Sequence, residues 1–376
     1  MPTRVILTSC PDYADVATAL PRLLDKLGGM GAFVRAGQSV LIKPNLLTDA
    51  RPDEAVTTHP EVVRAVIRLV KSTGANPWVA DSPANVADLA RVWERTGVQA
   101  ICREEDVPLV NLEKAGSERF EVEGVQFTIA RPVLDADAVI TVPKVKTHLL
   151  TGYTGAVKNL YGVVPGLQKT SLHKQYPRMD DFSKMLVMVF GRVKPVLAIA
   201  DGVVGMEGNG PSAGTPVRLG YLAASADSVA LDAVLCRTLG LEARQVRHLQ
   251  EAHRAGLGEV DRDRITVEGD GLAAPGPRKY CLPDTVPTHL IPRWAARLVK
   301  PLIWHRPDFT ARCVFCGQCV KACPVGALRI ERGQRPILTP STCIACCCCH
   351  EICPARAIEM RGSPLVKLIG RLRPKR

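Results

Sequence analysis

The stretch that decides the architecture lies near the end of the chain and reads Cys313-Val-Phe-Cys316-Gly-Gln-Cys319-Val-Lys-Ala-Cys323-Pro324. A second stretch repeats the pattern as Cys343-Ile-Ala-Cys346-Cys-Cys-Cys349-His-Glu-Ile-Cys353-Pro354. Both have the spacing C-x2-C-x2-C-x3-C-P, in which three thiolates on one tight loop bind three irons of a [4Fe–4S] cluster. The same loop cannot reach the fourth iron, so we expect the fourth cysteine of each run to bind the other cluster.

The sequence therefore predicts two [4Fe–4S] clusters with exchanged ligands, in the manner of bacterial-type ferredoxins. The first set is Cys313, Cys316, Cys319 and Cys353, and the second is Cys343, Cys346, Cys349 and Cys323. A zinc ribbon or a disulfide framework would not explain a doubled run with proline after each half. Because Cys347 and Cys348 are also thiols, a register shifted by one sulfur stays open for Cys346 and Cys349.

The composition is that of a globular protein of two or three domains in a reducing compartment. Of its 376 residues, 46% are hydrophobic and 23% charged, which is enough to build a core without disulfides. Ten of the 14 cysteines lie between residues 313 and 353, and clustered thiolate ligands need reducing conditions. Residues 1–30 lack the apolar run of a signal peptide, and no stretch has the roughly 18–20 apolar residues that span a bilayer. We therefore expect a cytoplasmic protein.

The net charge of +12 is confined to the last quarter of the chain. Residues 1–286 hold 33 basic and 33 acidic side chains, whereas residues 287–376 hold 16 basic and 4 acidic ones. This distribution argues against nucleic-acid binding by the larger, neutral part. It favours docking of the C-terminal part to an acidic redox partner protein, or peripheral contact with an anionic membrane.

The first 280 residues alternate between short apolar strands and amphipathic helices, which predicts an α/β domain with a mainly parallel sheet covered by helices. Strands are expected at residues 3–7, 39–42, 77–80, 138–142, 196–200 and 221–224, with a hairpin over 118–129 that turns at Gly124. Helices are expected at residues 14–27, 60–73, 87–96, 228–239 and 242–255.

Polar side chains follow four of these strands at their carboxyl ends. In open α/β sheets such ends form the crevice where ligands bind, although strands also run into ordinary polar turns. Four such ends, two of them with lysine, predict one shared site. The expected ligand-binding residues are Lys43, Asn45, Asp81, Lys144, Lys146, His148, Lys158, Asn159, Asp201 and Glu207. Lys144, His148 and Lys158 are the candidates for catalysis.

Glycine-rich segments flank this expected site. In residues 151–166, glycines allow backbone N–H groups close to an anion, and a helix beginning near Thr154 would direct its positive end there. With the lysines nearby, we expect a carboxylate or phosphate ligand, although a simple turn is the alternative. A second glycine-rich segment, 202–214, predicts a mobile loop or lid. Asp81, Asp201 and Glu207 are candidates for a hard-metal site of oxygen ligands, with turn-capping as the alternative.

Three segments resemble the family catalogued as domain of unknown function 362. They are Lys43-Pro-Asn45, Pro143-Lys-Val-Lys-Thr-His148 with Thr154-Gly-Ala-Val-Lys-Asn159, and Asp201-Gly-Val-Val-Gly-Met-Glu-Gly-Asn-Gly-Pro211. The resemblance covers most of residues 1–240. Members often carry a two-cluster ferredoxin module after this domain, so the resemblance implies the architecture and the importance of these segments. It implies no reaction and no substrate.

The chain is therefore expected to divide into four parts. These are an α/β domain at 1–286, a basic amphipathic linker at 287–308, a small ferredoxin-like α+β domain with two clusters at 309–360, and a basic tail at 361–376. The linker carries Leu290, Trp294, Leu298 and Leu302 on one helical face. We expect this face to pack on the larger domain as a strut, and a helix on a membrane surface is the alternative.

The leading functional hypothesis is an iron–sulfur oxidoreductase in which the module passes single electrons to an anionic ligand in the α/β domain. No G-x-G-x-x-G motif follows the first strand, so no organic cofactor is predicted. One alternative is a non-catalytic ferredoxin-like electron carrier or assembly factor whose larger domain recognises a partner protein. The other is a redox-sensing regulator whose tail contacts nucleic acid or membrane, which the neutral larger domain disfavours.

Overall fold

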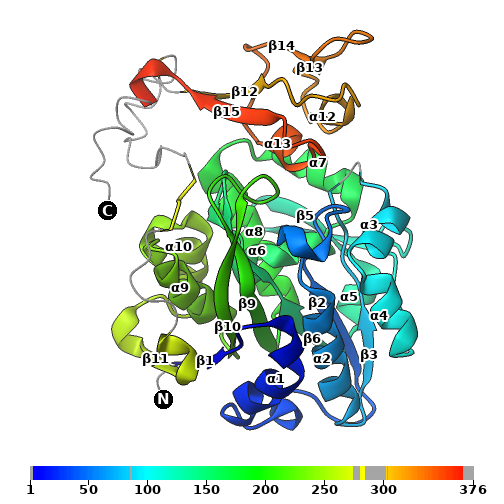
Figure 1. Ribbon diagram of the computed structural model, residues 1–376, viewed down its shortest axis with the longest axis vertical. Coiled ribbons are helices and arrows are strands. Elements are labelled where there is room, and N and C mark those ends of the chain that lie inside the picture. Colours follow the sequence, from blue (N-terminus) through cyan, green and yellow to red (C-terminus); the bar gives the residue numbers. More distant parts are fainter. Residues whose placement is uncertain (1–2, 85–86, 274–279, 284–301, 303, 367–376) are drawn as a thin grey trace.

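The computed structural model describes residues 3–84, 87–273, 280–283, 302 and 304–366, and its centre is a twisted sheet (Figure 1). The main path of this sheet has the strand order β11-β1-β10-β9-β6-β2-β3. Neighbours on this path are parallel, except that β10 runs antiparallel to β1 and β9. The bounds are β1 Thr3–Ser9, β2 Ser39–Pro44, β3 Asn76–Val79, β6 Ala138–Val142, β9 Leu197–Glu207, β10 Thr215–Ser225 and β11 Ile265–Glu268.

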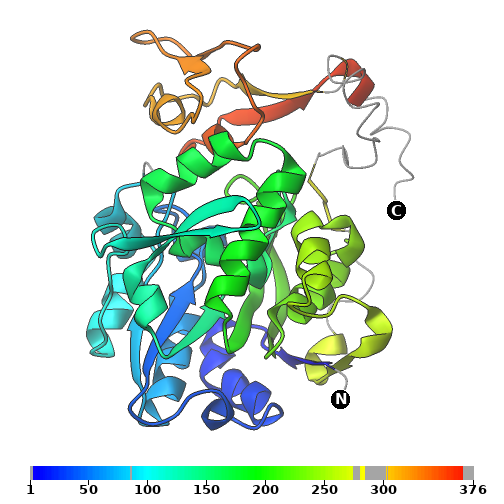
Figure 2. The ribbon, with the colours of Figure 1, turned by 180° about the vertical axis from the view of Figure 1, so that it is seen from behind.

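Helices cover both faces of the sheet (Figures 1 and 2). One apolar layer contains α1 Val16–Asp25, α2 Pro60–Lys71 and α4 Val98–Glu104, and the other contains α8 Met179–Val193, α9 Ser228–Thr238 and α10 Arg247–Arg254. Successive strand residues enter opposite layers, since Leu41 packs with the second set of helices and Ile42 with the first. Strands buried on both faces need continuous apolar runs, and the five residues of β6 are all buried.

The expected α/β class is confirmed, and most element boundaries agree within a few residues. The hairpin around Gly124 forms from β4 Ser117–Val122 and β5 Val125–Ala130. The sequence reading did not anticipate α7 Gly166–Gln175 or α8. Helix α7 follows a glycine-rich segment and has no apolar stripe in its sequence, so helical periodicity could not reveal it.

Only part of the segment 202–214 is the loop that its glycines suggested. Residues up to Glu207 complete β9, which pairs antiparallel with β10 as far as Thr215. A Cβ atom on Gly205 would lie 2.7 Å from the backbone oxygen of Val145 and 2.5 Å from Cδ1 of Leu219. Glycine is therefore needed here because neighbouring strands approach closely, and the expected loop is confined to residues 208–214.

The C-terminal module is a small α+β unit. It contains two strand pairs, β12 His305–Phe309 with β15 Ile358–Gly362 and β13 Leu328–Arg329 with β14 Ile337–Leu338, together with the short helices α12 Gln318–Lys321 and α13 Cys348–Glu351. In both views α13 faces the α/β domain near α7, and α12 lies farther out (Figures 1 and 2).

The pairing of β12 with β15 brings residues on both sides of the expected range 309–360 into the module. Most of the expected linker, including Leu290, Trp294 and Leu298, lies outside the described residues, as does the tail beyond residue 366. Within the described ranges, no helix combines the length and the apolarity that crossing a bilayer requires.

Candidate functional site

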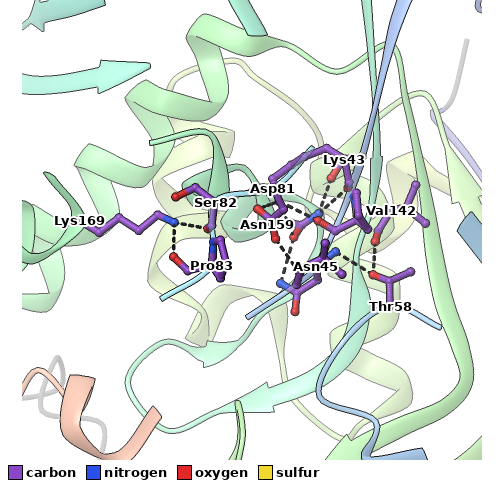
Figure 3. A network of polar contacts seen from close by, with 12 residues as sticks. Lys43, Asn45, Thr58, Asp81, Ser82, Pro83, Val142, Asn159 and Lys169 are labelled. Atoms are coloured by element: carbon purple, nitrogen blue, oxygen red, sulfur yellow. Dashed lines mark hydrogen bonds and ion pairs between the residues drawn. The ribbon is translucent and has the colours of Figure 1, made fainter. Parts of the chain in front are cut away.

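Lys43 ends β2, and its ammonium group is completely buried in a polar network (Figure 3). Its Nζ lies 2.7 Å from Oδ1 of Asp81 and donates to Oδ1 of Asn159 at 3.2 Å. Nδ2 of Asn159 donates to the backbone oxygen of Lys43 at 3.1 Å, and Oδ1 of Asn159 accepts a hydrogen bond from Nδ2 of Asn45 at 3.0 Å. Burial lowers the pKa of Lys43, and Asp81 opposes this shift. The structure brings these four predicted residues together, with the lysine charge balanced internally.

A second lysine is neutralised in the same way. Nζ of Lys144 lies 2.7 Å from Oδ2 of Asp201 and donates to the hydroxyl of Tyr13 at 2.8 Å. That hydroxyl donates to Oδ1 of Asp201 at 3.2 Å, and the Tyr13 ring stacks on His59 with centroids 3.5 Å apart. Burial lowers the pKa of Lys144 against the charge of Asp201, and burial lowers the pKa of His59 to about 4. Two of the four predicted lysines therefore belong to buried ion pairs.

Lys146, His148 and Lys158 form a third group, which we call the cationic group. Lys146 and His148 lie on β7 Lys144–His148, and Lys158 lies on α6 Gly155–Asn159. Nζ of Lys146 donates to the backbone oxygen of Val56 at 2.6 Å. Among the described residues of the α/β domain, no carboxylate forms an ion pair with Lys146 or Lys158. Burial lowers the pKa of both lysines, and the charge of Lys158 lowers that of Lys146 further.

The acid that faces the cationic group comes from the C-terminal module. Oε1 of Glu351, at the end of α13, lies 3.3 Å from Nε2 of His148. Nδ1 of His148 accepts the N–H groups of Leu150 at 3.1 Å and Thr151 at 3.3 Å, so the ring proton is on the nitrogen that faces Glu351.

The charges at this contact follow from burial. Burial, assisted by the charge of Lys158, lowers the pKa of His148 to about 3, so its ring is neutral. Burial works to raise the pKa of Glu351, but the contact with His148 and the charge of Lys158 outweigh it and lower this pKa to about 2. We therefore describe Glu351 as a carboxylate whose counter-charge is Lys158.

Two more contacts fix α13 and its loop against the α/β domain. Nη2 of Arg356 lies 2.8 Å from Oε1 of Glu54, and the hydroxyl of Ser212 donates to the backbone oxygen of His350 at 3.5 Å. Tyr161, buried next to this loop, donates its hydroxyl to the backbone oxygen of Lys169 at 3.0 Å. The second cysteine run therefore lies directly against the carboxyl ends of the sheet.

The helix that begins near Thr154 does not present a free positive end. It starts at Gly155, and the N–H groups of Ala156 and Val157 bond to the two carboxylate oxygens of Asp232 at 2.6 and 2.9 Å. Burial raises the pKa of Asp232 to about 8, although these two hydrogen bonds oppose the shift. The positive end of α6 is thus occupied by a side chain of the same domain.

The three carboxylates considered for a hard-metal site do not meet. Asp81 pairs with Lys43, Asp201 pairs with Lys144, and Oε2 of Glu207 accepts the N–H of Cys281 at 3.0 Å. Among the described residues, these three do not form a group with ligand atoms within 4.8 Å of one another. Each carboxylate has a structural role instead.

The cysteines of the module line two cavities. The first is bordered by Cys313, Cys316, Cys319 and Cys353, and the second by Cys323, Cys343, Cys346, Cys347 and Cys349. Within the described part of the chain, no three cysteine sulfurs lie within 4.8 Å of one another. One zinc ion with Zn–S bonds of about 2.3 Å would need sulfurs only ~3.8 Å apart. The sulfur donors that border both cavities are the ligand type that iron–sulfur clusters require.

The two loops have the same local backbone at an offset of 30 residues. Gly317 and Cys347 are both left-handed, with φ of 72° and 65°. Likewise Ala327 N–H bonds to Sγ of Cys323, and Ala357 N–H to Sγ of Cys353, both at 3.2 Å. Helices α12 and α13 start one residue after the left-handed position in each loop. This repeat aligns Cys346 with Cys316 and Cys349 with Cys319.

Sequence reasoning missed Glu351, Asp232 and Tyr161 as parts of this site. A signal for Glu351 was present, because it is the only acidic residue within the two cysteine runs and its equivalent in the first run is Lys321. Asp232 and Tyr161 carry no comparable signal, since their roles depend on contacts between distant segments.

Comparison with known proteins supports both halves of the chain. A model described as 4Fe-4S binding domain matches residues 309–329, so the C-terminal module binds a [4Fe–4S] cluster and serves electron transfer. NADH-quinone oxidoreductase subunit I from Psychrobacter cryohalolentis is 34% identical over 80 residues, which cover 21% of this chain and 41% of that protein.

Other matches fall mainly on the α/β domain. Thylakoid-associated protein sll1697 from Synechocystis sp. is 39% identical over 250 residues, 65% of this chain and 77% of that protein. The lactate racemase apoprotein from Thermoanaerobacterium thermosaccharolyticum has a TM-score of 0.42 and 14% identity, and the match covers 62% of this chain and 56% of that one. A family model matches residues 40–237, more than half of the 376 residues, and the chain belongs to the family described as Domain of unknown function (DUF362).

Proposed function

We propose that the protein is an iron–sulfur oxidoreductase with two [4Fe–4S] clusters, and that its module passes electrons to an anionic ligand bound in the α/β domain. Cys313, Cys316, Cys319 and Cys353 would hold one cluster, and Cys323, Cys343, Cys346 and Cys349 the other. When bound, each cluster supplies one-electron redox chemistry. The two cavities support this assignment, because the first is bordered by three cysteines of the first run and Cys353 of the second. The other is bordered by Cys323 of the first run and four cysteines of the second.

The observation that carries the proposal is the contact between α13 and the cationic group. Glu351, in the second cysteine run, lies 3.3 Å from His148, next to the buried Lys146 and the partly exposed Lys158, which lack a carboxylate of their own domain. Glu351 supplies one negative charge against the two lysines, so a further anion bound here would be stabilised. A ligand that gains electrons also gains negative charge, which Lys146 and Lys158 would offset.

The structure narrows the predicted site. Lys43 and Lys144 already have carboxylate partners, so we assign them to the framework that holds β2 and β7 in place. Of the catalytic candidates, Lys158 and His148 remain beside the module, and Lys146 joins them. In this assignment Asn159 and Asp81 are partners of the buried Lys43, and Asn45 donates to Asn159.

The test begins with anaerobic iron and sulfide assays, for which two clusters require about eight atoms of each per chain. Reduced protein is then mixed with small carboxylates and phosphate esters while the visible absorbance follows reoxidation. We expect one class to reoxidise the wild type, and Lys158→Met to abolish this while retaining its iron. Lys184→Met, at an exposed position of α8, is the matched control. Wild-type reoxidation rates in Lys158→Met would rule out the ligand site.

A second candidate is a non-catalytic electron carrier or assembly factor. The observation that favours it is the internal neutralisation of Lys43 and Lys144, which removes two cations from the expected crevice. Such a protein would exchange electrons with a partner protein and turn over no small molecule. The same reoxidation assay, with no small anion active, would therefore support this candidate.

A cytoplasmic location with peripheral membrane contact remains part of the proposal. The name of the thylakoid-associated relative and the basic C-terminal part of this chain support membrane contact. Co-sedimentation with vesicles that contain phosphatidylserine tests it, and salt should abolish the binding.

A further inference from the structure

The two halves of the C-terminal module are equivalent in backbone but not in environment. In the second half, α13 and its loop are covered by the α/β domain through Glu351, Arg356 and His350. In the first half, the equivalent surface has no such cover within the described residues: Lys321 is exposed, and Val314, Phe315 and Cys316 are exposed where they border the first cavity. We call Val314, Phe315, Cys316, Gln318, Val320 and Lys321 the outer face.

The charge of the outer face is opposite to that of its equivalent. Lys321 occupies in α12 the place that Glu351 occupies in α13, at the offset of 30 residues. Glu351 docks against a cationic group, so by the same geometry Lys321 is placed to meet an acidic one. The surroundings agree, because residues 305–366 hold eight lysines and arginines and only four acids, one of which is the buried Glu351.

An exposed aromatic residue in an unfavourable backbone conformation marks the same face. Phe315 has φ of 56°, whereas the equivalent Ala345 has φ of 55° with only a methyl side chain. A left-handed conformation is unfavourable at a bulky residue, and Phe315 keeps it at the border of the first cavity, where almost half of its surface is exposed. Exposed aromatic residues next to basic ones are typical of protein interfaces.

We propose that the outer face is the docking surface for a separate one-electron carrier protein with an acidic surface. This inference rests on the proposed function, because it makes the cavity of Cys313, Cys316, Cys319 and Cys353 the entry point and the cavity beside the α/β domain the exit. One electron leaves the reduced carrier, which becomes oxidised, and reduces the cluster in the outer cavity. No bond forms or breaks in this step, and no proton is required.

Binding is tested first without electron transfer. Oxidised acidic [2Fe–2S] ferredoxin of plant type is titrated into the oxidised full-length holoprotein by calorimetry, at low and at physiological salt. We expect binding that weakens with salt, and a Kd that rises about tenfold in both Lys321→Glu and Phe315→Ala. Lys184→Glu makes the same charge change on the exposed surface of α8 and should leave Kd within about twofold.

Electron exchange provides the second readout. Stopped-flow mixing with reduced ferredoxin should give a second-order rate constant that decreases as the salt concentration rises. In Lys321→Glu this rate constant should be about tenfold lower than in the wild type. The small reductant dithionite should reduce all variants at the same rate. Wild-type affinity and rate in both outer-face variants would overturn the proposal, as would no reaction with the acidic carrier or preference for the basic carrier cytochrome c.

Further results distinguish this docking surface from a membrane-contact surface and from failure of the proposed function. If Lys321→Glu loses binding to phosphatidylserine vesicles but keeps its affinity for the carrier, the face contacts membrane and the proposal is wrong. If the protein lacks iron, the proposed function itself fails. If iron and small-molecule reoxidation are intact while the outer-face variants behave as the wild type, only the docking surface is refuted.

Discussion

Nζ of Lys144 lies 2.7 Å from Oδ2 of Asp201, and neither side chain is exposed to solvent. The two residues face each other because β7 and β9 are parallel neighbours in which Lys144 is the partner of Asp201. Two further groups complete the pair, since the Tyr13 hydroxyl contacts both side chains and the N–H of His59 donates to Asp201 at 2.9 Å. This pair therefore ties the N-terminal segment and two strands together at the carboxyl end of the sheet.

The first prediction concerns this pair. Lys144→Met leaves the buried Asp201 carboxylate without its cation, and we expect the free energy of unfolding to fall by about 3–5 kcal/mol. The double variant Lys144→Met, Asp201→Leu removes both charges and should regain much of that loss. Urea unfolding of anaerobic protein measures both. Arg4→Ala, which removes an exposed partner of Glu268, is the control and should leave the free energy of unfolding nearly unchanged. A Lys144→Met cost as small as this control would show that the pair is not structural.

The second prediction is that stability falls in mild acid. Burial lowers the pKa of His248 to about 3 and those of His59 and His173 to about 4, whereas an unfolded histidine has a pKa of about 6.5. Between about pH 4 and 6.5 the unfolded chain therefore binds more protons than the folded one, so the free energy of unfolding decreases as the pH falls through this window.

His248→Phe tests this dependence. Neither ring nitrogen of His248 has a hydrogen-bond partner among the described residues, so an apolar ring can replace it. We expect the slope of unfolding free energy near pH 5 to decrease by up to about 1.4 kcal/mol per pH unit, the value for one proton. Visible absorbance in the same samples verifies that iron is retained. Parallel pH curves for wild type and variant would contradict the prediction.

The sequence predicted what depends on local pattern. The cysteine spacing placed two equivalent loops, and the apolar runs placed the strands, because a strand buried on both faces needs consecutive apolar residues such as those from Ala138 to Val142. The positions of Lys43 and Lys144 at strand ends also followed from the sequence, since both directly follow apolar runs.

The partners of these residues could not be predicted, because they depend on register and packing. Asp81 could have been a metal ligand or a turn cap, and only the parallel alignment of β2 with β3 places it beside Lys43. The glycines between residues 202 and 214 suggested mobility, but the sequence does not show that Val145 and Leu219 approach Gly205. The contact of Glu351 with His148 joins residues that are far apart in the chain, so no local pattern reveals it.

The third prediction tests the register of the second cysteine run. Cys347 has φ of 65°, at the position where the first run has Gly317, so Cys347→Gly should keep the full iron and sulfide content. Glycine adopts this conformation without strain, and stability should stay the same or rise by up to about 1 kcal/mol. Cys346→Ser removes an assigned ligand and should lose about half of the iron. The opposite outcome, with iron lost in Cys347→Gly and retained in Cys346→Ser, would shift the register by one sulfur.

The fourth prediction concerns the attachment of the module to the α/β domain. Glu351→Lys gives α13 the charge that Lys321 gives α12, and it places a third cation beside Lys146 and Lys158. Like charges buried together are unfavourable, so we expect the module to separate from the α/β domain and the radius of gyration in solution scattering to increase. Glu359→Lys makes the same change at an exposed site of β15 and serves as the control.

Because separation would also remove the cover from the second cysteine loop, Glu351→Lys should allow the acidic carrier to bind there. The number of carrier molecules bound per chain, measured by calorimetry, should then rise from one to about two. A compact Glu351→Lys protein with a stoichiometry of one would show that Glu351 does not hold the module in place.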